Sequence, residues 1–486
     1  MKMKRLVLAT AVLSSLGGLY GCSEGDDSSV VIEAGDGGTT TDTGSSGSLS
    51  QNCPDWTTAR NTVDDVDVCQ LPSEILEDRS LSSEIIWLMS GRVTVGNGNQ
   101  EMSVNEGTLA NSEAVLDVTL SIEPGTQVIA RTGTFANLLI TRGSKIQATG
   151  TASEPIIFSS DDEGYDGAGE WGGIILHGYG LHNECLTANN GVTACNVDSE
   201  GESGFGGGYT ADDSSGRMSY VIVTEGGYEF AVGNEINGIS LIGVGSGTIM
   251  DHIQVNSNAD DGIEFYGGNV NVKYMVLTGN QDDSIDWDEG YQGNIQYVIV
   301  KQTEDVGGNA IEADTQGTDD FLSRPTIANA TFIGHGDEEE LFVFKSGSAG
   351  FLHNSVATVD SANTTITDCV LVDGADAQDD RNISLVLNNI IADCTNLGDA
   401  VLSTTTIFSV AAGLDANYAS TATEATLGAA IDWDVINATY PNSGPDHQGT
   451  GSVADGDFLD ETDYAGAVEP GETAPWFQGW ILDGTL

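Results

Sequence analysis

The sequence predicts an all-β protein, a right-handed parallel β-helix (solenoid), and three observations lead to this prediction. From about residue 85 onward, short apolar strands alternate with Gly, Asn and Asp, without an apolar period of 3.6 residues. Two strand motifs recur together at one shared spacing. The hydrophobic content of 39% is high enough for a large buried core and argues against global disorder.

The repeat is clearest in a pentapeptide with a central isoleucine. It occurs as Asn237–Leu241, Asp261–Phe265, Asp283–Trp287 and Asn309–Ala313, so the central isoleucines lie 24, 22 and 26 residues apart. A second motif recurs in step, as Met250–Val255, Val272–Leu277 and Ile295–Val300, with weaker copies that start at Met218, Ile327, Ile366 and Leu387. Two motifs with one period predict a coil that closes on itself once per repeat.

Stacking of these coils explains how the chain buries its apolar side chains. A single coil of about 22 residues cannot bury them alone, but stacked coils place Ile239, Ile263 and Ile285 in one inner column. Each strand then pairs in parallel with its counterpart about 4.8 Å away, and the crossover rule predicts a right-handed coil. Propeller repeats are longer, at about 40–50 residues, and the pattern of leucine-rich repeats is missing.

The N-terminus predicts export, with residues 1–21 as a signal peptide. Met1–Arg5 is basic, and Leu6–Leu16 is apolar but shorter than the roughly 20 residues of a membrane span. Residues 19–22 (Leu-Tyr-Gly-Cys) resemble the lipobox of bacterial lipoproteins, which implies cleavage before Cys22 and acylation of its thiol. By resemblance to a known sorting rule, Ser23 in place of Asp favours the outer membrane. An ordinary signal peptide with an incidental cysteine is the alternative.

The charge balance is strongly acidic and excludes one class of partner. The chain has 15 Lys and Arg against 74 Asp and Glu, and its formal net charge is −59. Nucleic acid is therefore excluded, because phosphate binding needs a basic surface. Direct binding of anionic polysaccharide or anionic lipid is also disfavoured unless cations bridge the two. Solubility in salty water and the binding of divalent cations both remain as explanations for the charge.

Composition divides the mature chain into four parts. Residues 22–50 are rich in Gly, Ser, Thr and Asp and predict a lipid-anchored flexible tether. Residues 51–84 predict a disulfide-bearing N-terminal segment and cap, and residues 85–405 predict the β-helix, with a loop excursion at 178–217. Residues 406–486 predict an irregular C-terminal segment with an aromatic cap over the open final coil, and a ligand platform is the alternative for these aromatic residues.

Six cysteines remain after Cys22, an even number that suits an oxidising compartment. Six cysteines allow 15 pairings. Sequence proximity favours Cys53–Cys69, Cys185–Cys195 and Cys369–Cys394. A zinc site is the alternative, but the sequence has no CxxC motif and no histidine cluster near these residues.

Acidic residues recur beside the central isoleucines. Asp260, Asp261 and Glu264 belong to one coil, and the following coils contribute Asp282, Asp283, Asp286 and Glu312. Strand alternation predicts that Glu264, Asp286 and Glu312 stack outward at about 4.8 Å spacing, where they repel one another unless a cation binds. The expected ion is Ca²⁺, which prefers oxygen ligands and tolerates irregular geometry. The alternative is a solvated corner in which Asp261 and Asp283 only form turns.

Several stretches resemble poorly characterised bacterial surface lipoproteins with a right-handed β-helix body. The matching stretches are residues 122–126 (Ile-Glu-Pro-Gly-Thr), 171–174 (Trp-Gly-Gly-Ile), 260–268 (from Asp260 to Gly268), 464–467 (Tyr-Ala-Gly-Ala) and 479–480 (Gly-Trp). The resemblance implies a β-helix fold and export. It implies no particular activity and no catalytic residues.

Two classes of function fit the sequence, and the first is favoured. The chain is expected to be a non-enzymatic surface lipoprotein, held in the membrane through Cys22, that binds a glycan or an outer-membrane protein or forms a surface coat. The alternative is a polysaccharide-active enzyme whose carboxylates are Asp282, Asp283 and Asp286. Residues 281–283 and 334–336 resemble polygalacturonase motifs, with Lys345 as a possible partner, but the spacing is irregular. For a lyase, the nearest bases in sequence are Lys273 and Lys301, which lie in the other strand family.

Overall fold

The computed structural model describes the chain from residue 48 onward, with gaps. The described ranges are 48–162, 164–189, 194–198, 200–230, 235–303, 306–316, 321–336, 338–359, 365–372, 385–394, 458–460, 462, 464–469, 472 and 474–486. The expected signal peptide, Cys22, most of the expected tether and residues 406–457 lie outside the described residues. Within the described part of the chain, no helix combines the length and apolar character that crossing a membrane requires.

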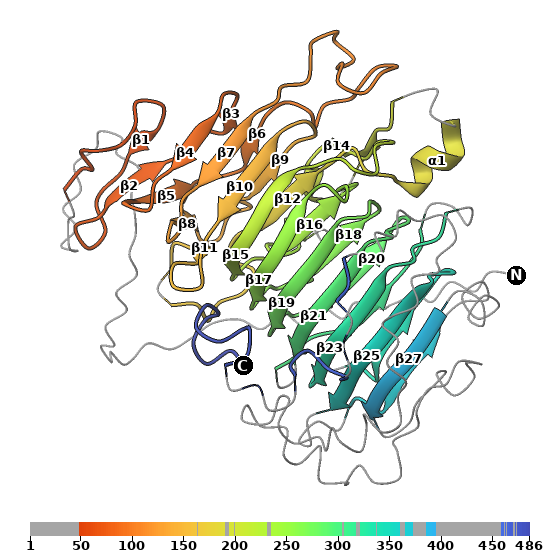
Figure 1. Cartoon of the computed structure of the whole chain (residues 1–486). Coiled ribbons are helices and arrows are strands. Elements are labelled where there is room, and N and C mark those ends of the chain that lie inside the picture. Colours follow the sequence, from red (N-terminus) through yellow and green to blue (C-terminus); the bar gives the residue numbers. More distant parts are fainter. Residues whose placement is uncertain are drawn as a thin grey trace, which may run out of the picture.

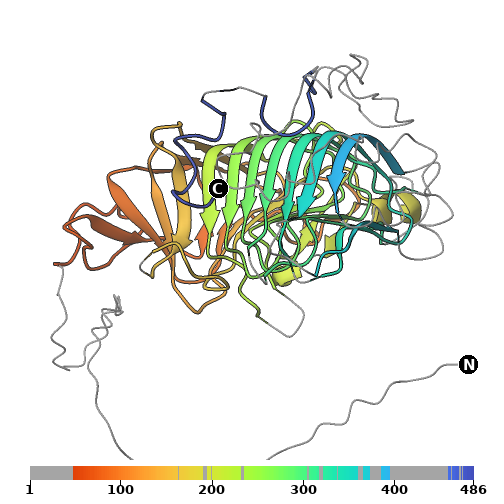
Figure 2. The same cartoon turned by 90° about the horizontal axis from the view of Figure 1, so that it is seen from below.

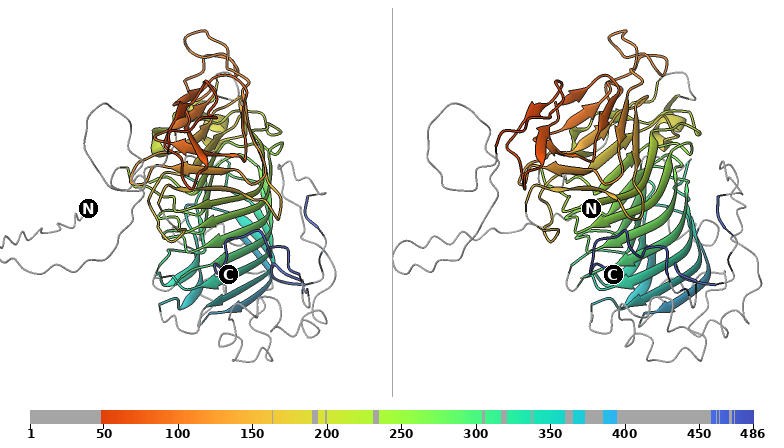
Figure 3. Two further views of the ribbon diagram at one scale, coloured as in Figure 1. Left: turned by 90° about the vertical axis from the view of Figure 1, so that its left-hand side faces the viewer. Right: turned by 60° about the vertical axis from the view of Figure 1, so that its left-hand side comes forward.

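Two large parallel sheets form the body, and the coils stack along one axis (Figures 1 and 3). The ten-stranded sheet contains β3 (Glu74–Ile75), β6 (Val93–Val95), β9 (Leu138–Ile140), β12 (Ile174–His177), β16 (Ile239–Ile242), β18 (Ile263–Tyr266), β20 (Ile285–Asp288), β22 (Ile311–Ala313), β24 (Glu340–Phe344) and β26 (Asp368–Val372). The fold is therefore an all-β parallel β-helix, as the repeat predicts.

The fifteen-stranded sheet wraps around the rest of each coil. Its strands are β1 (Thr58–Ala59), β2 (Asp67–Gln70), β4 (Arg79–Leu81), β5 (Ile85–Met89), β7 (Thr119–Ile122), β8 (Gln127–Ala130), β10 (Lys145–Thr149), β11 (Ile156–Ser160), β15 (Gly216–Thr224), β17 (Ile249–Asn256), β19 (Asn271–Thr278), β21 (Asn294–Lys301), β23 (Thr326–Gly334), β25 (Gly350–Val359) and β27 (Leu385–Asp393). β1 pairs antiparallel with β2 at the N-terminal end, where Trp56 stacks on Trp87.

Six long strands of the fifteen-stranded sheet, β15, β17, β19, β21, β23 and β25, each bend at one residue with a positive φ. These residues are Tyr220, His252, Tyr274, Tyr297, Asn329 and Asn354. The short strand β10 pairs with the first half of β15, up to Ser219, and β11 pairs with its second half, from Val221. The bend therefore marks a corner of the coil, and each long strand contributes to two of three faces. Left-handed backbone is uncommon outside glycine, so its recurrence at one register shows a corner repeated from coil to coil.

The inner column of isoleucines has the predicted register. Ile174, Ile239, Ile263, Ile285 and Ile311 are consecutive Cα partners, and all are buried. The second motif is also confirmed, because Met250 pairs with Val272, Val272 with Ile295, and Ile295 with Ile327.

One weaker copy of the second motif is wrong. Ile366 precedes β26, which pairs with β24 in the ten-stranded sheet. The second-motif strand of that part of the chain is β25, in which Leu352 pairs with both Ile327 and Leu387. Short apolar runs have the same sequence pattern in both sheets, so the pattern at Ile366 does not specify which sheet the strand joins.

The excursion between β12 and β15 contains α1 (Asn183–Asn189), β13 (Val197–Asp198), the 3₁₀ turn η1 (Glu200–Glu202) and β14 (Phe205–Gly206). It lies against the outer surface of the ten-stranded sheet, where Gly206 closely approaches Ile242 and Gly201 approaches Ile236. Both isoleucines belong to an apolar cluster outside the coil. This packing buries a face that an isolated sheet would expose to water.

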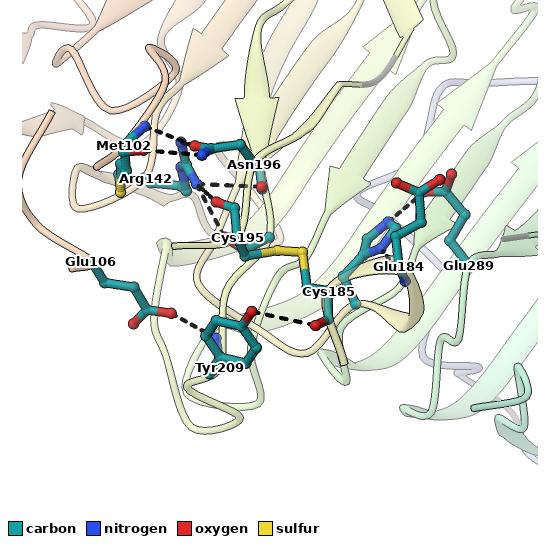
Figure 4. Close-up of a disulfide and its surroundings, with 12 residues drawn as sticks. Met102, Glu106, Arg142, Glu184, Cys185, Cys195, Asn196, Tyr209 and Glu289 are labelled. Atoms are coloured by element: carbon teal, nitrogen blue, oxygen red, sulfur yellow. Dashed lines mark hydrogen bonds and ion pairs between the residues drawn. A yellow bond between two sulfur atoms is a disulfide. The ribbon is translucent and has the colours of Figure 1, made fainter. Parts of the chain in front are cut away.

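All three predicted disulfides are present. They join Cys53 to Cys69 in β2, Cys185 to Cys195 within the excursion (Figure 4), and Cys369 in β26 to Cys394 directly after β27. The zinc alternative is therefore wrong.

The aromatic C-terminal segment does not have the predicted position. The described residues between 458 and 486, named here the C-terminal strap, lie along the side of the long strands (Figure 2, dark blue over the green strands). Three outward side chains on these strands are apolar, namely Ile222, Val276 and Ile299, and the strap buries them. The strap therefore covers a lateral face, whereas the prediction placed it over the open final coil.

Candidate metal site

The candidate site lies on the outer face of the ten-stranded sheet, on β18, β20 and β22. Glu264 pairs in register with Asp286, and Asp286 with Glu312, while the preceding isoleucines point into the core. The carboxylate stack predicted from strand alternation is therefore present. The labels β18 and β20 in Figure 1 mark its position next to the excursion.

Three overlapping groups of carboxylates form this acidic row. They are Asp260–Asp261–Asp282, Asp261–Glu264–Asp286 and Asp283–Asp286–Glu312. In each group, one oxygen atom from every member lies within 4.8 Å of the others. Asp261 and Asp286 each belong to two groups, so neighbouring groups share a carboxylate. The structure thus brings together all seven residues that the sequence predicts as metal ligands.

Three of the seven carboxylates in the row are more deeply buried than the sequence suggests. Asp283 is 4% exposed, Asp261 is 6% exposed and Glu264 is 7% exposed. Asp282 is exposed at the edge of the row, and Asp286 and Glu312 are half-buried. The interpretation as a solvated corner is therefore wrong for Asp261, Asp283 and Glu264.

Two neighbours that are not among the predicted site residues, Asn237 and Tyr266, help to cover the row. Asn237 Nδ2 donates to Glu264 Oε2 at 2.6 Å and lies 3.3 Å from the hydroxyl of Tyr266. Asn237 occupies the position in its pentapeptide that Asp261 and Asp283 occupy in theirs. The repeat therefore contained a signal for Asn237, and a search restricted to acidic residues missed it.

The buried aspartates also hold consecutive coils together. Asp261 Oδ1 accepts a hydrogen bond from the backbone N–H of Asp283 at 2.9 Å, and Asp283 Oδ1 accepts one from the N–H of Asn309. Asp286 Oδ1 is buried and has no hydrogen-bond partner among the described residues. A buried carboxylate oxygen without a donor is costly, and a bound cation would remove this cost.

The electrostatics of the row favour either protonation or cation binding. Burial, followed by the charges of neighbouring aspartates and Glu264, raises the pKa values of Asp261 and Asp286 well above the usual range. The pKa of Asp283 rises to about 7, first through burial and then through Asp282. Burial and the nearby Asp314 raise the pKa of Asp288 to about 7. Without a cation, several of these groups therefore hold a proton near neutral pH.

One positive charge already lies at the end of the row. Lys345, directly after β24, forms an ion pair with Glu312. Its charge also favours the ionised form of Asp283, which opposes part of the rise in the pKa of that residue. Lys345 was expected only in the enzyme alternative, in which Lys273 and Lys301 are the nearest bases in sequence. Lys273 instead pairs with Asp460 of the strap at 3.0 Å.

The residues of the enzyme alternative are only partly brought together. Asp282, Asp283 and Asp286 all belong to the row, and Lys345 joins it through Glu312. His335 directly follows β23 in the fifteen-stranded sheet, and its backbone N–H donates to Gln302 Oε1 at 3.0 Å. The carboxylates and the lysine thus form one constellation, and the motif around His335 has a backbone role at a turn.

This geometry defines the protein as a parallel β-helix protein with an acidic row on one outer face. Comparison with protein families identifies residues 93–439 as a pectate-lyase-like beta helix domain, and the chain belongs to this family because the match covers more than half of it. Comparison with curated proteins and with solved structures found no match.

Proposed function

We propose that the chain is an exported, lipid-anchored surface protein that binds Ca²⁺ in the acidic row and presents a rigid β-helix face to a glycan or protein partner. The observation that carries the proposal is the row itself, in which three groups of carboxylates share members across consecutive coils. The function in this proposal is binding, and the bound ions stabilise the coils that form the binding face.

Calcium suits the row better than a smaller divalent ion does. It accepts six to eight oxygen ligands at about 2.3–2.6 Å with flexible geometry, whereas Mg²⁺ demands near-ideal octahedral sites. Carboxylates that are fixed by strand register at about 4.8 Å spacing cannot move freely to build an octahedron. Calcium also offsets the burial and the repulsion that raise the pKa values of Asp261 and Asp286.

The lipid anchor and the outer-membrane location rest on the first 23 residues. The basic start, the short apolar run and the cysteine at position 22 support processing as a lipoprotein, and Ser23 supports the outer membrane. Incorporation of a labelled fatty acid by expressing cells tests this part. Label is expected in the native chain and lost in Cys22→Ala, and equal labelling of both would contradict lipidation.

Isothermal titration of the mature protein with Ca²⁺ tests the binding site. Asp283→Asn with Asp286→Asn removes two charges from the row and is expected to weaken binding at least tenfold. Asp117→Asn is a matched control, because Asp117 is exposed and pairs with Lys145 outside the row. Equal binding in the double variant and the native protein would reject the site.

A second candidate function is a polysaccharide lyase, and the position of Lys345 supports it. A lysine beside a cation site offers a proton acceptor, and the pectate-lyase-like domain supplies a suitable scaffold. The test is release of reducing ends from neutral and acidic glycans in the presence of Ca²⁺. Release that is lost in Lys345→Gln would favour the enzyme, and glycan binding without release would favour the binding protein.

A further inference from the structure

The C-terminal strap is held by amide side chains that project outward from the long strands. Gln254 of β17 accepts a hydrogen bond from Leu482 N–H at 2.8 Å and donates to Thr485 Oγ1 at 3.0 Å. Gln296 of β21 accepts from Asp460 N–H at 2.8 Å and donates to the carbonyl of the same residue at 3.0 Å. Both glutamines are fully buried under the strap. They therefore recognise the strap mainly through its backbone.

Further along, β23 and β25 continue this pattern. The Asn329 side chain donates to the backbone carbonyl of Tyr464 at 3.1 Å, and the backbone carbonyl of Asn354 accepts from Gly466 N–H at 2.8 Å. Thr331 Oγ1 accepts from Ala467 N–H at 2.9 Å. The strap thus crosses several coils, and its main chain is satisfied by the β-helix at each crossing.

Aromatic side chains anchor the strap between these polar contacts. The corner residues Tyr220, His252 and Tyr274 stack on one another, with ring centroids 4.1 and 4.6 Å apart. Trp480 meets Tyr220 edge-on at 5.8 Å, and Trp476 lies 5.4 Å from Tyr274. Backbone recognition combined with aromatic anchors is the chemistry of a peptide-binding surface.

A long segment of the chain separates the strap from the strands that it covers. Sixty-three residues, 395–457, separate Cys394 from Phe458. This length could span about 200 Å when fully extended, whereas β19 lies only about 20 Å from β27 at the usual strand spacing. The strap also lies outside residues 93–439, which the family domain comprises. Chain connectivity therefore does not determine which copy of the protein receives a given strap.

We propose that the lateral face formed by the long strands of the fifteen-stranded sheet, from β15 to β25, is a peptide-binding site. Its partner is the strap of a second copy of this chain. The contacts are the same within one copy and between two copies, so concentration decides between them. In dilute solution each copy binds its own strap. Where copies are crowded, straps exchange and link neighbouring molecules.

Two complementary full-length variants test this exchange. In the first, Trp476→Ala and Trp480→Ala disable the strap, and in the second, Gln254→Ala and Gln296→Ala disable the face. Each variant alone is expected to be monomeric. Their mixture is expected to form a one-to-one dimer in light scattering, because the intact strap of the second variant binds the intact face of the first. A mixture that stays monomeric would overturn the proposal.

A second measurement keeps the test valid if either variant fails to fold. A protease site inserted within residues 440–456 of the otherwise native chain is cleaved, and a fluorescent peptide of residues 457–486 is added in excess. The peptide is expected to replace the resident strap, and the same peptide with both tryptophans changed to alanine is expected to stay free. A nicked protein that never takes up the native peptide would overturn the proposal.

Discussion

Individual carboxylates in the acidic row make the stability of the metal-free fold depend on pH. In the metal-free fold, Asp261, Asp283 and Asp286 have raised pKa values, so the folded state binds more protons than the unfolded chain between about pH 4 and pH 7. Their contribution to stability is therefore complete below the unfolded pKa near 3.8. It is lost as the pH rises through the folded pKa values.

We expect the melting temperature of the metal-free protein to fall by about 5 °C as the pH rises from about 5 to about 8. Added Ca²⁺ should remove most of this loss, because a bound cation replaces the protons. Differential scanning calorimetry with a chelator and with Ca²⁺ measures both curves. In Asp261→Asn with Asp283→Asn the metal-free curve should be flatter, and an unchanged slope would contradict the assignment.

Lys345 should weaken Ca²⁺ binding, because its ammonium group lies at one end of the row and pairs with Glu312. Replacing it with Met removes this competing charge. About 1 kcal/mol of relief, reduced by solvent because the lysine side chain is 39% exposed, corresponds to roughly fivefold tighter binding. Titration calorimetry measures the change, and Lys345→Arg, which keeps the charge, is the control. Weaker binding in Lys345→Met would show that the lysine supports the site.

At the scale of elements, the repeat predicted the register of the strands more reliably than it predicted the burial of their outward side chains. Regular spacing between Ile239 and Ile311 was enough for the register of β16 to β22, because a slip of one residue would turn isoleucines outward. The burial of Asp261 and Glu264 could not be predicted in the same way. It depends on contacts between coils, such as the hydrogen bond from Asn237 to Glu264, which the spacing of the isoleucines does not encode.

The C-terminal strap shows the same limit. Trp476 and Trp480 indicated that the end of the chain must bury aromatic surface, but composition does not specify which surface it covers. The stacked corner of Tyr220, His252 and Tyr274 forms only when positive-φ residues align across coils. This alignment is a property of the assembled fold.

The excursion depends on one buried arginine. Arg142 of the β9–β10 turn donates to the carbonyls of Gly98 at 2.8 Å, Gln100 at 2.9 Å and Cys195 at 2.6 Å, and Figure 4 shows it beside Cys195 and Asn196. Burial lowers its pKa to about 10, so it remains a cation near neutral pH. One side chain thus ties the disulfide-bearing loop to an early coil.

Arg142→Met should leave these carbonyls without donors and cost about 3 kcal/mol. We expect faster chymotrypsin cleavage within residues 178–217, read by mass spectrometry, because the excursion loses its attachment. Arg217→Met is the control, since Arg217 forms a partly exposed pair with Asp251. Equal cleavage rates in both variants would show that the excursion is held by other contacts.

At the scale of the whole molecule, the formal net charge of −59 opposes folding through self-repulsion. We expect the melting temperature to rise by several degrees when NaCl increases from about 20 to about 200 mM, because the Debye length falls to below about 10 Å. At matched ionic strength, Ca²⁺ should add a further rise in the native protein and none in Asp283→Asn with Asp286→Asn. Equal effects of Ca²⁺ and NaCl in the native protein would indicate screening alone.

The excursion and the strap clamp the same middle coils on different sheets. The excursion reaches from Met102, bonded to Asn196, to Glu289, where His182 Nε2 lies 2.5 Å from Oε2. Solenoids usually come apart one turn at a time, because each turn touches only its neighbours. Here the excursion and the strap join the middle coils into one cooperative unit. Heat or mechanical force should therefore unfold the outer coils first and then the middle coils together in one step.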